Sequence, residues 1–91
     1  MTSESLPTRI PILIPDLGSG TESIRISAWL VDLGQTVIAG DRVVEVLVPG
    51  ITFDIQTAHT GELVEITRVV DAIVQPGDVV GWIVAESFDV S

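Results

Sequence analysis

The sequence contains no cysteine and no lysine, and each absence excludes a class of chemistry. Without cysteine there are no disulfide bonds, thiol nucleophiles or thiolate metal sites. Without lysine there is no side-chain amine. Four arginines stand against thirteen acidic residues, which gives a net charge of −9. Nucleic acids and anionic membranes are therefore excluded as partners, because either needs a basic protein surface, whereas a basic protein partner would be attracted.

Long hydrophobic runs are also missing. The run from Ile10 to Pro15 is far shorter than the roughly 20 residues that cross a bilayer. The first eight residues are polar and have neither the basic nor the apolar region of a signal peptide. These features predict a cytoplasmic protein.

The 91 residues are 46% hydrophobic, which predicts one compact domain. Aromatic residues make up only 4%, so valine, isoleucine and leucine must form the core. We expect the domain to span residues 10–84, after a flexible N-terminal segment at 1–9 and before a C-terminal tail at 85–91.

Short β-branched runs separated by turn residues are typical of an all-β sandwich or barrel. Pro11 and Pro15 place the first strand at a sheet edge, because proline donates no ladder hydrogen bond. Trp29 lies on the polar side of its strand and is expected to cover a neighbouring loop. The expected strands are residues 10–14, 23–30, 35–38, 43–48, 51–56, 62–70 and 79–84.

The strongest turn signal lies between Val48 and Ile51. Proline presets the first central φ of a type II turn, and glycine accepts the positive φ of the second. Pro49 and Gly50 therefore predict a hairpin between strands 43–48 and 51–56.

A turn followed by a strand occurs twice, 37 residues apart: residues 40–47 match residues 77–84. This repeat predicts two similar halves related by a pseudo-two-fold axis. Asp41 and Asp78 follow a glycine at equivalent places, and we expect them to cap backbone N–H groups of the two turns.

Three stretches, in order, resemble the lipoyl domains of the biotinyl/lipoyl attachment family: IPDLG at 14–18, WLVDLGQTVIAGD at 29–41 and VQPGDVV at 74–80. Members of this family carry a swinging cofactor arm in 2-oxoacid dehydrogenase complexes, and biotin carriers are similar. The resemblance covers about residues 12–84. It implies a flattened β-barrel or sandwich of two four-stranded antiparallel sheets with quasi-two-fold symmetry.

The resemblance places the family's attachment motif, E-T-D-K-A, on residues 47–51, with the lysine position at Gly50. Amide attachment of lipoate or biotin needs a nucleophilic ε-amine, which this chain lacks. We therefore expect no lipoate or biotin cofactor. The apolar turn that replaces the motif is a candidate interaction tip, made of Leu47, Val48, Pro49, Gly50 and Ile51.

Other residues that suggest chemistry are isolated. The segment 18–20 is similar to a phosphate-binding loop, but neither a Lys-Ser/Thr pair nor a helix follows it. His59 is the only imidazole, so a zinc or copper site lacks ligands. A nucleophile, a base and an orienting group do not occur together. We expect no enzyme activity, no catalytic residues and no metal-binding residues.

Two hypotheses for function follow. In the first, a non-acylated lipoyl-like domain acts as a protein-interaction or assembly module through its tip, with 2-oxoacid dehydrogenase or carboxylase components as partners. In the second, the chain is a fragment or paralogue of a dihydrolipoamide acyltransferase or biotin carrier that has lost its attachment site and its activity. An apolar tip on an acidic protein favours the first hypothesis.

Overall fold

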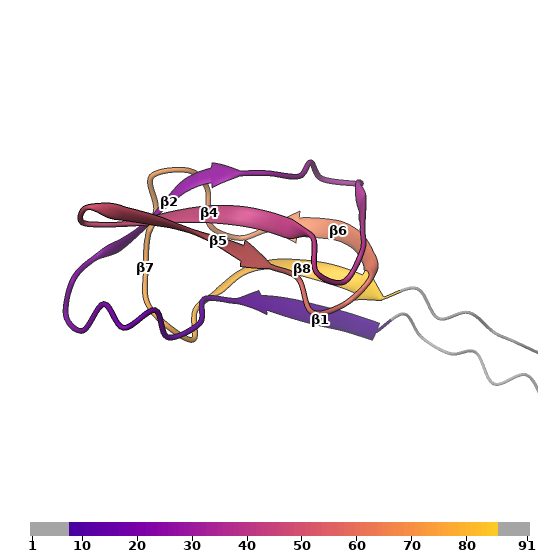
Figure 1. The fold of residues 1–91 in the computed structure, drawn as a ribbon. Coiled ribbons are helices and arrows are strands. Elements are labelled where there is room, and N and C mark those ends of the chain that lie inside the picture. The colour runs from indigo at the N-terminus through magenta and orange to yellow at the C-terminus, as the bar shows by residue number, and fades with distance from the viewer. Residues whose placement is uncertain (1–7, 86–91) are drawn as a thin grey trace, which may run out of the picture.

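The computed structural model describes residues 8–85 and consists of two packed sheets (Figure 1). One sheet has the strand order β1-β8-β6-β3 and the other β5-β4-β2-β7, and every pairing is antiparallel. The predicted fold class is confirmed. The strands are β1 (Thr8–Leu13), β2 (Ile24–Trp29), β3 (Thr36–Val37), β4 (Arg42–Val48), β5 (Ile51–Gln56), β6 (Gly61–Ile66), β7 (Ile73–Val74) and β8 (Val79–Ala85). Residues 8–85 include no helix able to cross a membrane.

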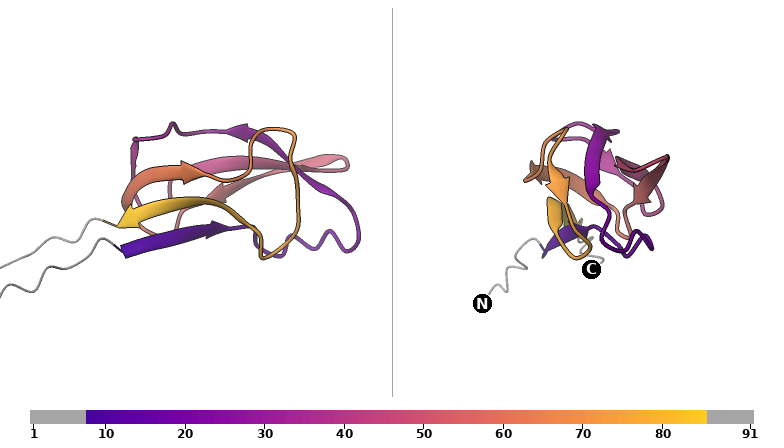
Figure 2. Two further views of the ribbon diagram at one scale, coloured as in Figure 1. Left: turned by 180° about the vertical axis from the view of Figure 1, so that it is seen from behind. Right: turned by 90° about the vertical axis from the view of Figure 1, so that its left-hand side faces the viewer.

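The strand ladder extends slightly past the expected domain limits, because Thr8 pairs with Ala85. The remainder of the expected N-terminal segment and tail lies outside the described residues. β1 is an edge strand, as Pro11 and Pro15 predict. The β4–β5 hairpin turn lies at one end of the molecule, and the beginning of β1 and the end of β8 lie at the other end (Figures 1 and 2).

One expected strand ends early and one strand was not expected. β6 stops at Ile66 rather than at residue 70, and the short β7 follows. Asp71 has a φ of 77°, and Ala72 donates to the carbonyl of Val69 at 3.0 Å, which closes a turn. A strand cannot continue through a left-handed residue, so the apolar run is interrupted there.

The two halves of the chain repeat the same structure. β2, β3 and β4 recur 37 residues later as β6, β7 and β8. The backbone hydrogen bonds repeat as well: Leu30 N–H donates to Val43 O at 2.9 Å, and Thr67 N–H donates to Val80 O at 2.9 Å. The pseudo-two-fold arrangement expected from the sequence is therefore present.

The two aspartate caps are equivalent in the two halves. Asp41 Oδ2 accepts the Ile38 N–H at 3.0 Å, and Asp78 Oδ2 accepts the Gln75 N–H at 2.9 Å. Both side chains thus fix the turn that precedes a long core strand, as predicted.

The core between the sheets is aliphatic. Val44 and Val46 are fully buried, as expected, and Val43 is also buried because the pairing of β4 with β5 shifts register between Arg42 and Val44. Trp29 covers the loop after β6, where its Nε1–H donates to Arg68 O at 2.8 Å. The buried hydrophobic residues are Ile12, Ile14, Ile24, Ile26, Val31, Val37, Val43, Val44, Val46, Val48, Ile55, Leu63, Val74, Val80 and Ile83.

Candidate functional site

The hairpin between β4 and β5 ends in the predicted two-residue turn. Val48 pairs with Ile51, and Pro49 and Gly50 connect them. Gly50 has a φ of 84°, the left-handed value that a type II turn needs at its second central residue. The turn chemistry read from the sequence therefore places these residues at the end of a projecting hairpin (Figure 1).

The tip is less apolar on its surface than the sequence suggests. Leu47 is 41% exposed and Ile51 is 52% exposed, whereas Val48 is only 5% exposed. Val48 shares the inward parity of Val46 in β4 and belongs to the core, so its assignment to the contact surface is wrong. Ile51 is accessible because it begins β5, an edge strand.

Gly50 opens to solvent. A Cβ atom built on this residue meets no heavy atom within 4 Å. A side chain at this position would therefore extend away from the domain, although the positive φ would strain any residue other than glycine.

A hollow of about 410 Å³ lies beside the tip. The row of outward-facing residues Ile73, Arg25 and Leu47 crosses three neighbouring strands here, because Arg25 pairs with Leu47 of β4 and with Ile73 of β7. We call this site the Arg25 hollow. Its lining residues are Ser23, Arg25, Leu47, Pro49, Gly50 and Asp71.

The sequence did not indicate the Arg25 hollow. Arg25 follows the alternation of any outward-facing strand residue, and Asp71 comes directly after a stretch predicted as strand, residues 62–70. One signal was available: Asp71 matches Gly34 at the 37-residue offset, and both have a positive φ.

The remaining candidates have local structural roles. His59 lies in the β5–β6 turn, where its N–H donates to Thr57 Oγ1 at 3.2 Å. The Gly18 N–H, in the loop compared with phosphate-binding loops, donates to Asp16 Oδ1 at 2.9 Å. Within residues 8–85, no three His, Cys, Asp or Glu side chains group together in a way that could hold a metal ion.

Comparison with protein families identifies the kind of domain. A family model for biotin and lipoyl domains, described as "Biotin-requiring enzyme", matches residues 10–83. The chain belongs to this biotin/lipoyl family. No curated protein matches the chain at a significant level.

Among solved structures, this biotin/lipoyl domain is similar to the urea carboxylase of Kluyveromyces lactis, with a TM-score of 0.72 and 19% sequence identity. The similarity covers 92% of this chain and 7% of that chain, so the domain spans a small part of the length of the carboxylase. At this level of identity, the two proteins share the fold.

Proposed function

We propose that this chain is a non-acylated biotin/lipoyl domain that acts as a protein-interaction or assembly module through its hairpin tip. The contact residues are Leu47, Pro49, Gly50 and Ile51. The partner is a protein component of a multienzyme system, of the carboxylase or 2-oxoacid dehydrogenase kind.

The observation that carries this proposal is the chemistry of the tip. The sequence resemblance places the family's attachment position at Gly50, a turn residue that has no side chain, and the chain contains no lysine. An amide link to biotin or lipoate therefore has no amine to form on. A purely structural turn does not need exposed apolar neighbours, yet Leu47 and Ile51 are 41% and 52% exposed.

Affinity capture with matched variants tests the proposal. Leu47→Asp and Ile51→Asp each place a charge on the tip without touching the core. Leu33→Asp is the control, because Leu33 is 59% exposed and lies in the loop between β2 and β3, outside the tip. We expect a protein from the native lysate to be retained by the wild type and by Leu33→Asp, and to be lost from both tip variants. Equal retention by all four proteins would reject the tip as an interface.

The second candidate is a domain that has lost its attachment site, belongs to a longer carrier chain or derives from one, and keeps no activity. Its support is the similarity to the urea carboxylase, of whose length this chain spans 7%. This candidate predicts no tip-dependent partner in the capture experiment. Both candidates predict an unchanged intact mass after co-expression with a lipoate or biotin ligase, and a mass increase by one cofactor would contradict both.

A further inference from the structure

The Arg25 hollow combines apolar walls with two opposite charges. Leu47 and Pro49 contribute apolar surface, while Arg25 and Asp71 bring a guanidinium and a carboxylate to the same hollow. No ion pair within 4.0 Å joins Arg25 to Asp71. Both charged groups are therefore available to a binding partner.

Arg25 differs in this respect from the other arginines. Arg9 forms an ion pair with Glu65 at 2.5 Å, and Arg42 forms one with Asp54 at 3.6 Å. Arg68 donates to the Thr67 carbonyl at 3.2 Å. Within the described part of the chain, Arg25 has neither an ion pair nor a side-chain hydrogen bond. An unpaired arginine is unexpected in this chain, since its thirteen acidic residues outnumber its four arginines.

The position of Arg25 is fixed by the sheet. Its neighbours Ile24 and Ile26 are 1% and 0% exposed, so strand alternation directs Arg25 to the outer face. On that face it lies between Leu47 and Ile73, which are 41% and 60% exposed. Arg25 thus has an apolar cross-strand neighbour on each side, and a ligand in the hollow that contacts Arg25 would also cover the apolar surface of Leu47.

Asp71 is held by the backbone rather than by its side chain. Its N–H donates to Ile26 O at 2.8 Å, and its φ of 77° is one that aspartate tolerates better than most residues. The opposite half of the fold uses Gly34 at the equivalent place. A residue with a side chain in a left-handed position is a reason to look for a function.

We propose that the Arg25 hollow binds a partner segment of mixed charge, in which an acidic side chain contacts Arg25, an apolar side chain packs on Leu47, and a basic side chain contacts Asp71. This occupant follows from charge complementarity: a segment with charges of one sign would meet a like charge at one side of the hollow. The inference rests on the proposed interaction at the tip and names the chemistry of the partner there.

The test uses defined peptides and the intact chain. Three blocked pentapeptides have the sequences Gly-Glu-Leu-Lys-Gly, Gly-Glu-Leu-Glu-Gly and Gly-Lys-Leu-Lys-Gly. Each is titrated into ¹⁵N-labelled protein, and amide shifts are followed by NMR. We expect the mixed-charge peptide to bind most tightly and to shift Ser23, Arg25, Leu47 and Gly50.

Two variants of the hollow test whether Arg25 contacts the acidic side chain of the peptide and Asp71 the basic one. Arg25→Gln should weaken the mixed-charge peptide by about three- to fivefold, whereas Arg42→Gln, an exposed arginine that does not line the hollow, should have no effect. Asp71→Asn keeps a residue that accepts a positive φ and removes the charge. It should raise the affinity for the di-glutamate peptide relative to the mixed peptide.

Three results would overturn the inference: no binding of any peptide, equal binding of all three, or binding of the di-lysine peptide alone with shifts spread over the surface. The last result would indicate nonspecific attraction to a chain of charge −9. Ile51 belongs to the tip but does not line the hollow, so the capture experiment with Ile51→Asp is independent of the peptide titration. Loss of capture in Ile51→Asp with no peptide binding would retain the tip and reject the hollow.

Discussion

Asp71 occupies in the second half of the fold the place that Gly34 occupies in the first. Their φ values are 77° and 87°, and their N–H groups donate to the carbonyls of Ile26 and Leu63 at 2.8 and 2.7 Å. The fold therefore requires a left-handed residue at both places. Only one of the two residues can adopt that conformation without strain.

Replacement of Asp71 by glycine should stabilise the domain. Relief of left-handed strain, about 1–2 kcal/mol, exceeds the extra chain entropy of glycine, about 0.5–1 kcal/mol. Urea denaturation should show a free energy of unfolding higher by up to about 1 kcal/mol. Gly34→Ala should lower it by about 1–2 kcal/mol. A destabilised Asp71→Gly variant would mean that the carboxylate makes a stabilising contact in solution.

Gly61 should not tolerate a methyl group. A Cβ atom on Gly61 would lie 2.2 Å from the Val84 carbonyl oxygen and 2.7 Å from Ile83 Cγ2, where β6 pairs with β8. Overpacking of this kind costs about 1–3 kcal/mol, and the loss of backbone pairing adds to it. Gly61→Ala should therefore lower the thermal midpoint more than Gly50→Ala, where φ is strained but space is open. Equal midpoints would show that β6 can shift away from β8.

Restoration of a lysine at the tip tests the attachment register. Pro49→Asp combined with Gly50→Lys should be acylated by a lipoate or biotin ligase, because a side chain at residue 50 extends into open space. We expect a cost of about 1–2 kcal/mol from the positive φ. Intact-mass spectrometry detects the adduct, with Thr52→Lys as the control for a nearby lysine out of register. Modification of the control alone would place the register elsewhere.

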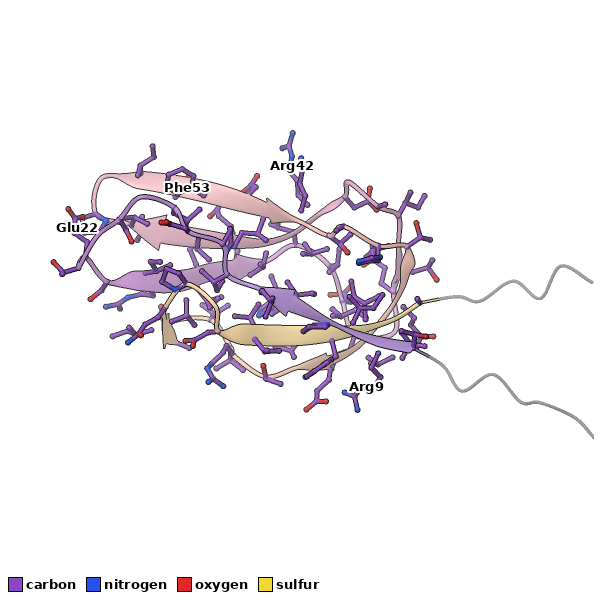
Figure 3. All side chains as sticks on the ribbon, turned by 90° about the horizontal axis from the view of Figure 1, so that it is seen from below. Arg9, Glu22, Arg42 and Phe53 are labelled. Carbon is purple, nitrogen blue, oxygen red and sulfur yellow. The ribbon has the colours of Figure 1, made fainter. Side chains whose placement is uncertain are left out.

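Arg9 links three strands on the outer face of the other sheet. Its guanidinium lies 5.1 Å from the centre of the Trp82 ring and pairs with Glu65 (Figure 3 shows Arg9). Such exposed contacts contribute about 0.5–1 kcal/mol. Arg9→Ala should lower the unfolding free energy by about that amount and change the fluorescence of Trp82. Arg42→Ala serves as control and should leave the emission spectrum unchanged.

The sequence predicted most of the fold because its signals are local. The alternation in residues 51–56 and the proline of β1, Pro11, are local signals, and the 37-residue repeat predicted the symmetry. The errors arise where the position of a residue depends on contacts between segments that are distant in the sequence. Val48 was assigned to the surface of the tip, although strand parity continues the inward row of Val46. The Arg25 hollow requires β2, β4 and β7 to be adjacent, which no local pattern reveals.

The pairing of Thr8 with Ala85 makes β8 and β1 the symmetric counterpart of β4 and β5. Replacement of residues 86–91 and 1–7 by one short linker from Ala85 to Thr8 would close the backbone into a ring, and a break between Pro49 and Gly50 would then give a circular permutant with every strand pairing intact. In that permutant the tip becomes a pair of free chain ends, while Ala85 and Thr8 are joined by a new hairpin turn.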